Sequence, residues 1–251
     1  MSDRDTPRVA VVGGGVAGLT AGTFTARAGF DTVVLNHGES ILRRNAHLEN
    51  VPGFPAGVNS RLFADLLERQ AERNGCLIEA GHVTEITGAD GGFRLRVDEA
   101  NRSDIRSDYV IVASWAESTY LETLDAVGLV SRGSKTYVEV DDDGRTGVDG
   151  LYAAGRIAGK AHQVIVCAGH GAEVALTLVH DSDVPFYHDW VVPEGYFTDR
   201  GWDVPPGCEE IDGDERRRRE RESIELMAEA FETTHPDDPT PHPTLVEDSE
   251  K

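Results

Sequence analysis

The chain has 251 residues and carries 45 Asp and Glu residues against 24 Lys and Arg residues, which gives a formal net charge of −21. Such a surface repels nucleic acids and anionic membranes, so the composition argues against both as partners. Only three of the basic residues are lysines. A strongly acidic, lysine-poor surface is typical of a halophilic cytoplasmic protein, and an acidic face that docks a partner is the alternative.

The three cysteines, Cys76, Cys167 and Cys208, are widely spaced and form neither a C-x-x-C motif nor a metal-binding pattern. We therefore expect buried, reduced thiols and no metal site. A redox pair of Cys76 and Cys167 stays open, because the sequence does not give the distance between them. The N-terminal residues MSDRDTPR contain no apolar signal segment, and no apolar run is long enough to span a membrane, so a cytoplasmic location is expected.

The first third of the chain has the pattern of a β-α-β unit followed by a second helix. Apolar runs predict strands at residues 8–12 and 32–35, with a buried helix over residues 16–28 between them. Ser60 is a candidate N-cap for a helix that ends at Asn74, before Gly75. An apolar stripe on this helix would comprise Phe63, Leu66 and Leu67.

The middle of the chain predicts alternating strands and a final buried helix. Residues 82–113 alternate around a turn at 89–92, and residues 108–113 form a continuous apolar run, as expected of a buried parallel strand. Residues 136–180 then predict strands, a turn at Asp143–Gly144 and a helix from about Gln163. The segment 181–251 differs: it has one expected helix, 215–231, and its last twenty residues are proline-rich and expected to be disordered.

The residues Gly13-Gly14-Gly15-Val16-Ala17-Gly18 fit the pattern G-x-G-x-x-G between the first strand and the first helix. In this context the first glycine permits a tight turn, the second lets the backbone approach a pyrophosphate, and the third lets the helix pack on the strand. A dinucleotide site also needs an acid at the end of the second strand, for the ribose. Asn36 stands there instead, with Glu39 as the alternative.

Four stretches in order carry a resemblance to the thioredoxin-reductase-like family of FAD-dependent pyridine nucleotide-disulfide oxidoreductases. They are VVGGGVAGLTAG (11–22), ENVPGFP (49–55), DYVIVA (108–113) and the pair GRTGVDGLYAAGR (144–156) and HQVIVCAGHGAEVA (162–175). The resemblance implies an α/β fold: a Rossmann-like FAD-binding three-layer domain over residues 1–180, with a parallel sheet and a small antiparallel β-meander, followed by a C-terminal extension over 181–251. A homodimer is a further expectation.

The resemblance also assigns FAD-binding residues along the chain. It places the pyrophosphate at the glycine turn, a ribose at the end of the second strand, the flavin beside the loop at 50–53, the ribityl-phosphate arm at 155–156 and the pyrimidine edge at 162–164. The implied residues are Gly13, Gly15, Val16, Ala17, Gly18, Asn36, Asn50, Pro52, Gly53, Gly155, Arg156, His162, Gln163 and Val164. His162 is in addition a candidate catalytic acid or base, with a simple cofactor contact as the alternative.

The sequence departs from the family pattern at three points. Arg156 stands where the family has an aspartate. Only 22 residues separate Ala113 from Thr136, where the family inserts an NAD(P)H-binding domain. No C-x-x-C motif is present, so disulfide exchange of the thioredoxin reductase type is not expected. Trp115 lies in the shortened segment and is expected to plug the space of the missing domain, or else to stack near the cofactor.

Three functions remain open at this point. The first is an FAD-dependent oxidoreductase of unknown substrate, with a small-molecule or protein electron donor or acceptor. The second is a non-catalytic, regulatory nucleotide-binding protein, and the third is an enzyme that forms an adenylated intermediate. The aromatic residues of the extension are expected to cover a cleft or a subunit interface, or to pack as an ordinary arm: Trp190, Tyr196, Phe197 and Trp202.

Overall fold

The computed structural model describes residues 6–98, 104–242 and 244–245. The chain divides into two compact units. The first reaches Ser182 and includes the segment from Pro239 onward, and the second comprises residues Asp183–Asp238.

A five-stranded parallel sheet with the order β10-β7-β1-β2-β3 forms the centre of the first unit. Its strands are short. The inner residues of β1, β2, β7 and β10 are mostly apolar and buried on both faces, as is typical of parallel sheets, whereas the edge strand β3 is partly exposed. Val12 at the end of β1 pairs in register with Leu35 of β2 and with Val112 of β7. The strand bounds are Arg8–Val12 (β1), Asp31–Asn36 (β2), Leu77–Ala80 (β3), Tyr109–Val112 (β7) and Leu151–Ala153 (β10).

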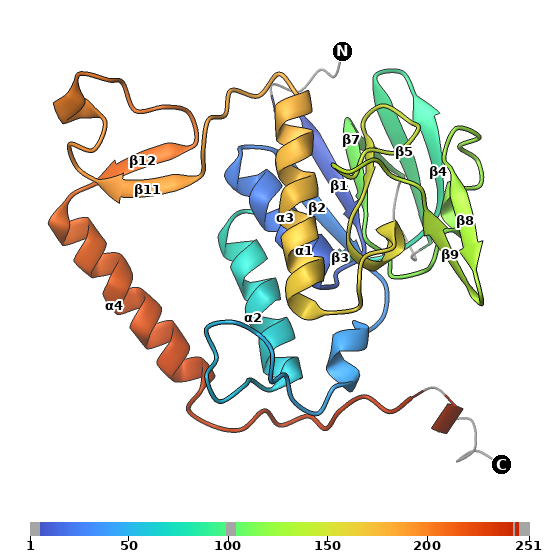
Figure 1. Ribbon diagram of the computed structural model, residues 1–251, viewed down its shortest axis with the longest axis horizontal. Coiled ribbons are helices and arrows are strands. Elements are labelled where there is room, and N and C mark those ends of the chain that lie inside the picture. Colours follow the sequence, from blue (N-terminus) through green and yellow to red (C-terminus); the bar gives the residue numbers. More distant parts are fainter. Residues whose placement is uncertain (1–5, 99–103, 243, 246–251) are drawn as a thin grey trace. The chain divides into compact units, whose positions relative to one another are not determined.

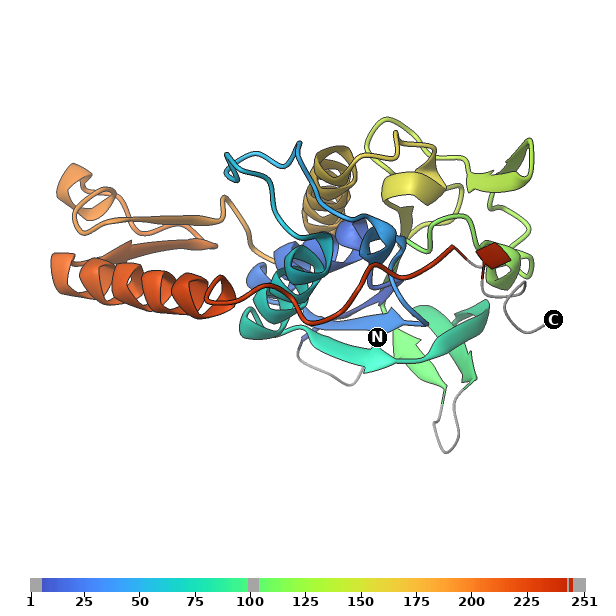
Figure 2. The same cartoon turned by 90° about the horizontal axis from the view of Figure 1, so that it is seen from below.

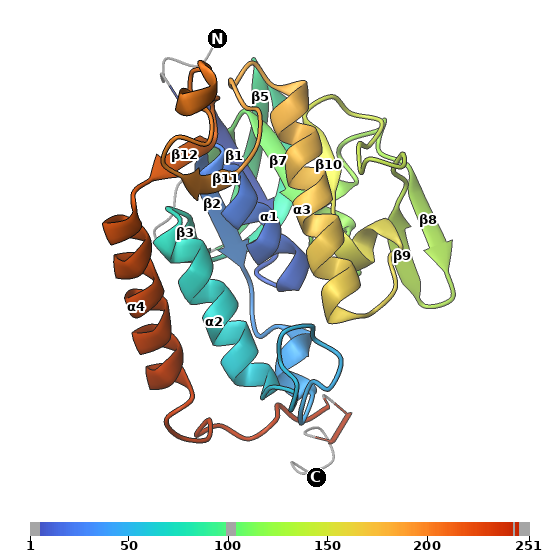
Figure 3. The same cartoon turned by 60° about the vertical axis from the view of Figure 1, so that its left-hand side comes forward.

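Three helices pack on one face of this sheet: α1 (Val16–Arg27), α2 (Ser60–Arg73) and α3 (Val164–Asp181) (Figure 1). Figure 3 shows α1 and α3 side by side. A Cβ atom on Gly171 of α3 would lie 2.3 Å from the carbonyl oxygen of Ala17, so glycine lets these two helices approach closely. By length and composition α3 could cross a membrane, but its buried side, which includes Val174 and Leu178, packs in the core of this unit.

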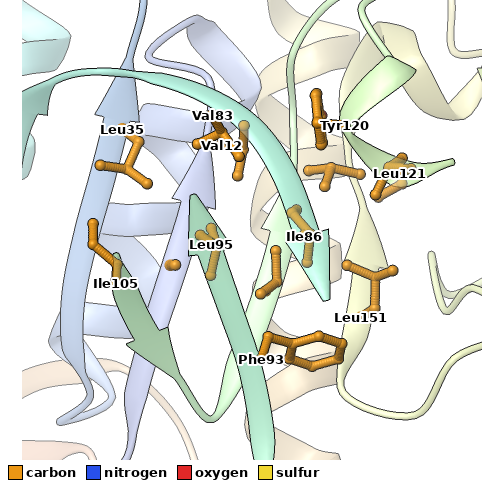
Figure 4. Close-up of a cluster of buried hydrophobic side chains, with 14 of the residues drawn as sticks. Val12, Leu35, Val83, Ile86, Phe93, Leu95, Ile105, Tyr120, Leu121 and Leu151 are labelled. Carbon is orange, nitrogen blue, oxygen red and sulfur yellow. The ribbon is translucent and has the colours of Figure 1, made fainter. Parts of the chain in front are cut away.

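The opposite face of the parallel sheet carries an antiparallel layer (Figure 2). It consists of β4 (His82–Ala89), β5 (Gly92–Asp98) and β6 (Ile105–Ser107). Phe93, Leu95 and Val97 alternate on β5 and are buried, as expected from their spacing. Figure 4 shows Ile86, Phe93 and Leu95 in the cluster that joins this layer to the parallel sheet. The expected three-layer α/β fold is confirmed.

A short hairpin and several helical turns complete the first unit. The hairpin is formed by β8 (Leu129–Arg132) and β9 (Lys135–Val138), and it occupies the chain segment where an inserted domain would begin. The turns are η1 (Ile41–Arg44), η2 (Thr119–Leu121) and η3 (Gly155–Ala158). Strand β9 packs against η3 (Figure 3).

Two details of helix α2 differ from the prediction. Its N-cap is Asn59, whose side chain accepts hydrogen bonds from the N–H groups of Arg61 and Leu62, and Ser60 is the first helical residue. Asparagine is as good an N-cap as serine, and the Ser60 hydroxyl donates to the Asn45 carbonyl instead. The expected apolar stripe of Phe63, Leu66 and Leu67 is only partly buried, while smaller Ala64 and Ala71 are fully buried.

The second unit contains a parallel pair, β11 (Trp190–Pro193) and β12 (Cys208–Ile211), a turn η4 (Thr198–Arg200) and helix α4 (Gly213–Ala230). Asp212 caps α4, which begins two residues before the predicted start. The arginines at 216–219 pair with acidic side chains of this unit, as expected for a solvated helix face.

The proline-rich C-terminal segment, expected to be disordered, is anchored where it is described. Thr240 belongs to the first unit, and its N–H donates to the Arg43 carbonyl. Residues 243 and 246–251 of the predicted disordered tail lie outside the described residues.

Candidate functional site

A cavity of 970 Å³ opens at the carboxyl ends of the parallel strands. The residues at the ends of β1, β2 and β7 line it, namely Val12, Leu35 and Ala113. The order in which the chain adds strands to the sheet reverses between β1 and β7. Open α/β sheets bind ligands at the carboxyl edge beside such a point. Its volume suits a large organic ligand.

The turn between β1 and α1 is fixed by backbone contacts that only glycine permits. Gly13 has φ +113°, and a Cβ atom on it would lie 2.7 Å from the carbonyl oxygen of Ala113. A Cβ atom on Gly18 would lie 1.9 Å from the carbonyl oxygen of Gly13. Glycine at these two positions is therefore required by the fold itself, whether or not a ligand binds.

Gly15 differs from its neighbours in the turn. Its backbone is extended, with φ −86° and ψ −175°, which any L-residue can adopt. The nearest atom to an added Cβ would be the Ser40 hydroxyl, 3.8 Å away, so no steric contact of the fold requires glycine here. Gly15 also lines the cavity and is the N-cap of α1, where no side chain caps the helix and no acid stands in the first turn. The open N–H groups and the positive helix end favour an anion at this point.

Asn36 supports the turn from the end of β2. Its Oδ1 atom accepts a hydrogen bond of 3.2 Å from the N–H of Gly14, and the residue lines the cavity. Glu39, the alternative to Asn36, also lines the cavity, and its carboxylate accepts a hydrogen bond of 2.6 Å from the Thr240 hydroxyl. Both side chains therefore lie where a ribose could reach them, with Asn36 closer to the glycine turn.

Two histidines at this end of the cavity were not singled out in the sequence. The rings of His37 and His82 are stacked, with centroids 4.3 Å apart, and both line the cavity. His37 follows β2, and His82 follows Gly81 just beyond the end of β3. Because β2 and β3 are parallel neighbours, their positions at the same sheet edge were the signal that could have revealed the pair.

The loop expected beside the flavin contacts the start of α3. The side-chain amide of Asn50 donates a hydrogen bond of 2.8 Å to the Oε1 atom of Gln163, and both residues line the cavity together with Val164. Pro52 and Gly53 lie in the same loop but are exposed and not among the lining residues. Arg61 of α2, only 5% exposed, supports the loop by donating to the Asn45 carbonyl at 2.6 Å.

Gly155 connects the glycine turn to α3. It has φ +72°, and a Cβ atom on it would lie 2.6 Å from the Cβ of Ala17. Its N–H donates a hydrogen bond of 2.9 Å to the Nδ1 atom of buried His170. Burial, with a contribution from the charge of Lys160, lowers the pKa of His170 to about 4. His170 is therefore neutral near pH 7 and acts as a hydrogen-bond acceptor.

Arg156, the departure from the family aspartate, contacts the hairpin that follows β7. Its guanidinium donates to the Tyr137 hydroxyl at 2.6 Å and to the Lys160 carbonyl at 3.1 Å, and it stacks over the Tyr137 ring at 5.0 Å. Arg156 also lines the cavity. Its side chain is thus held by neutral partners at the site where the family pattern has a carboxylate.

Trp115 and His162 meet at the same part of the cavity. Trp115 has φ 62°, and its ring packs edge-to-face with that of His162 at 4.2 Å between centroids. The Lys135 ammonium lies 5.3 Å from the Trp115 ring. Trp115 therefore contacts the hairpin, as a plug would, but it also lines the cavity. We call Trp115, Lys135, Tyr137, Arg156 and His162 the cationic cluster.

The cysteines do not have the properties of a redox disulfide. Cys76 is buried beside Gly22, and burial raises its thiol pKa to about 12. Cys167 lines the cavity, and burial raises its pKa as well. All three cysteines are free thiols. Within residues 6–98, 104–242 and 244–245, no group of three or more His, Cys, Asp or Glu side chains is placed to hold a metal ion.

Comparison with known proteins agrees with this architecture. The family model for pyridine nucleotide-disulphide oxidoreductases matches residues 7–171. A thioredoxin reductase of Rickettsia bellii is 27% identical over 118 residues, covering 46% of this chain and 37% of that protein. A dihydrolipoyl dehydrogenase of Haloferax volcanii is 26% identical over 202 residues, covering 79% of this chain and 39% of that protein. The chain thus spans well under half the length of these relatives.

Solved structures show the same fold. The thioredoxin reductase of Lactococcus lactis has a TM-score of 0.62 at 13% identity, and the similarity covers 70% of this chain and 99% of that chain. A ferredoxin-flavin thioredoxin reductase of Clostridium acetobutylicum has a TM-score of 0.56 at 15% identity, covering 71% and 98%. At this level of identity the similarity establishes the fold.

Proposed function

Because the chain belongs to the pyridine nucleotide-disulphide oxidoreductase family, we propose that it binds FAD along the cavity and acts as an FAD-dependent oxidoreductase. The observation that carries the proposal is Gly15. The fold leaves free space at its Cβ position and its backbone is extended, so no steric contact of the fold requires glycine at this point, whereas a diphosphate close to the α1 N-terminus would.

The residues along the cavity fit the parts of FAD. The N–H groups from Gly15 to Gly18 would hold the diphosphate, and Asn36 or Glu39 would hold the adenosine ribose. At the other end, Asn50, Gln163 and Val164 would face the flavin ring. Bound FAD would supply hydride or single-electron transfer, a chemistry that no side chain of this cavity offers.

His162 is the candidate proton donor or acceptor in this proposal. It lines the cavity beside the start of α3. Its pKa is lowered by burial first, and then by the charges of Arg156 and Lys135. A neutral imidazole near pH 7 can accept a proton from a bound substrate, which is the role we assign to it.

The electrons would come from outside the chain segments that we describe. The connection from β7 to β9 holds only a hairpin and short turns, and the sequence has no second G-x-G-x-x-G motif and no C-x-x-C motif. A thioredoxin reductase reaction is therefore not part of the proposal. The donor would be a small molecule or a protein that reaches the cavity.

A second candidate function is nucleotide binding without redox chemistry. Asn36 gives a ribose an uncharged partner, and Arg156 replaces an acid of the family pattern. Both changes alter the contacts expected with FAD, whereas the glycine turn that would bind any dinucleotide is intact. A regulatory protein that binds an adenine dinucleotide would keep the turn and tolerate these changes.

The colour of the purified protein separates the two candidates. Bound oxidised FAD is expected to give absorption bands near about 370 and 450 nm that dithionite bleaches. Colourless protein that also fails to bind added FAD, but binds ADP, would support the second candidate and refute the first. Anaerobic mixing of the coloured protein with NADH or NADPH then tests whether a nicotinamide reduces it directly.

A further inference from the structure

Two charged residues of the cationic cluster lack the carboxylate partners that several arginines of this acidic chain have. Arg8 pairs with Asp31, Arg43 with Asp65 and Arg145 with Asp181. Lys135 and Arg156 form no ion pair with any carboxylate in the part of the chain that the structure describes. Two cations that both act on His162 thus have no neutralising carboxylate, in a chain with 45 acidic residues.

The geometry brings both cations close to His162, at the end of the cavity that Trp115, Arg156 and His162 line. Arg156 follows Gly155 in η3, and Lys135 lies on β9, which packs against η3. Trp115 links them to His162, because its ring contacts the Lys135 ammonium and the imidazole. The charges of Lys135 and Arg156 both act on His162, as the lowering of its pKa shows. The Nε atom of Arg156 is buried and has no hydrogen-bond partner among the described residues.

We propose that Lys135, Arg156 and His162 form an anion subsite, which binds the carboxylate or phosphate of a small organic substrate at this end of the cavity. A guanidinium with a spare donor, an ammonium and an imidazole are the groups that recognise such anions. Calling the bound anion a substrate rests on the proposed oxidoreductase function. The subsite itself would bind the anion in the protein without FAD.

Charge favours a small anion over an acidic protein as the occupant. The net charge of −21 repels a large acidic partner over its whole surface. A small anion inside the cavity experiences mainly the nearby cations, since charges beyond about 10 Å are screened at moderate salt. The α1 N-terminus remains the place for a diphosphate, because its N–H groups surround Gly15 rather than Arg156.

The test is calorimetric titration of the full chain with inorganic phosphate and with pyruvate, at fixed ionic strength, with and without saturating FAD. We expect saturable binding under both conditions, and the tighter probe identifies the anionic group. Lys135→Gln and His162→Gln should each weaken binding about tenfold, which corresponds to about 1.4 kcal/mol. Arg132→Gln is the matched control, because it removes a positive charge from the same hairpin. Arg132 stacks on Tyr137 at 5.8 Å, whereas Lys135 lies 5.3 Å from the Trp115 ring and acts on His162.

Three results would overturn the subsite. They are the absence of saturable binding, an equal loss in Arg132→Gln, and displacement of phosphate by FAD, which would place the anion in a part of the cavity that FAD itself occupies. Melting curves of Lys135→Gln establish that the variant is folded. If the protein binds phosphate through Lys135 but does not bind FAD, the proposed function alone is refuted. If it binds FAD but does not bind phosphate through Lys135, the subsite alone is refuted.

Discussion

The glycine turn lines the same cavity as Trp115, Arg156 and His162 of the cationic cluster, yet different forces hold the two regions. The turn is fixed by backbone contacts, such as those of Gly18 with the Gly13 carbonyl and of Gly13 with the Ala113 carbonyl. The cluster is assembled by side chains from the loop after β7, from β9, from η3 and from the start of α3. A local backbone constraint leaves no tolerance for a side chain, whereas a side-chain cluster can lose one contact and persist. The comparison predicts large effects in the turn and small ones in the cluster.

The largest effect is expected for Gly18→Ala. The new Cβ atom would lie 1.9 Å from the backbone carbonyl of Gly13, which cannot move without breaking the turn. We expect a loss of about 3 kcal/mol or more in the free energy of unfolding, measured by urea denaturation without added FAD. Gly169→Ala is the control, because it lies in α3 with no atom within 4 Å of its Cβ position. A stable Gly18→Ala protein would show that the turn is not rigid.

His170 tests the junction between the two regions through pH. Its pKa is lowered to about 4 from the ordinary histidine value of about 6.5, because the folded protein buries the ring. Between these values the unfolded chain binds the proton and the folded chain does not, so stability is complete above pH 6.5 and falls as the pH drops towards 4. The resulting loss in the free energy of unfolding reaches about 3 kcal/mol at the acid end of this range.

The measurement compares the free energy of unfolding of the wild type and His170→Asn from pH 7 to pH 4, at one salt concentration. Asparagine cannot titrate, and its Oδ1 atom can accept from the Gly155 N–H in place of Nδ1. The difference between the two curves cancels the other titrating groups. We expect the wild type to lose more stability with acid, and parallel curves would contradict the assignment.

Gly15→Val separates ligand binding from folding within the turn. The valine side chain would enter the space beside the α1 N-terminus and exclude a diphosphate from its N–H groups. We expect FAD affinity to fall at least about 100-fold, or about 2.7 kcal/mol. The free energy of unfolding without FAD should fall by no more than about 1 kcal/mol, because valine is a poorer N-cap residue than glycine.

The control is Gly88→Val, which also has open space at its Cβ position but lies on β4 and does not line the cavity. FAD titration by calorimetry and urea denaturation give the two readouts for both variants. A Gly15→Val protein that binds FAD normally would remove the observation on which the proposed function rests.

The same contrast explains what the sequence could reveal. Strand β1 and the start of α1 agree with the prediction to the residue, because the apolar run and the glycine spacing act locally. The α2 cap was misplaced by one residue, since Asn59 and Ser60 are both good caps and only tertiary contacts decide between them. Thr240, expected to be disordered, is held by Glu39 and Arg43, residues about 200 positions earlier that no local pattern connects to it.

For the site, the glycine turn and the contact of Asn50 with the start of α3 follow the family pattern. The cationic cluster could not be predicted, because no motif connects Lys135 and Tyr137 on the hairpin to Arg156 and His162. Pro52 and Gly53, taken from the family pattern, are exposed and outside the cavity lining. A family pattern therefore transfers well where backbone geometry determines the residue and poorly where side chains from separate segments meet.

The smallest effect is expected for Tyr137→Phe, which removes a single contact of the cationic cluster. The change deletes the hydroxyl that accepts a hydrogen bond of 2.6 Å from the Arg156 guanidinium. It keeps the aromatic ring on which that guanidinium stacks. Because Arg156 is only partly buried and keeps its bond to the Lys160 carbonyl, we expect a loss of about 1 kcal/mol in the free energy of unfolding.

Tyr152→Phe is the matched control, since its buried hydroxyl donates to Asp181 at 3.0 Å and does not line the cavity. Both variants should lose similar stability, but only Tyr137→Phe should change phosphate binding, because it alone releases the Arg156 side chain. A loss above about 3 kcal/mol would mean that the cluster is as rigid as the turn, and the contrast between the two regions would then be wrong.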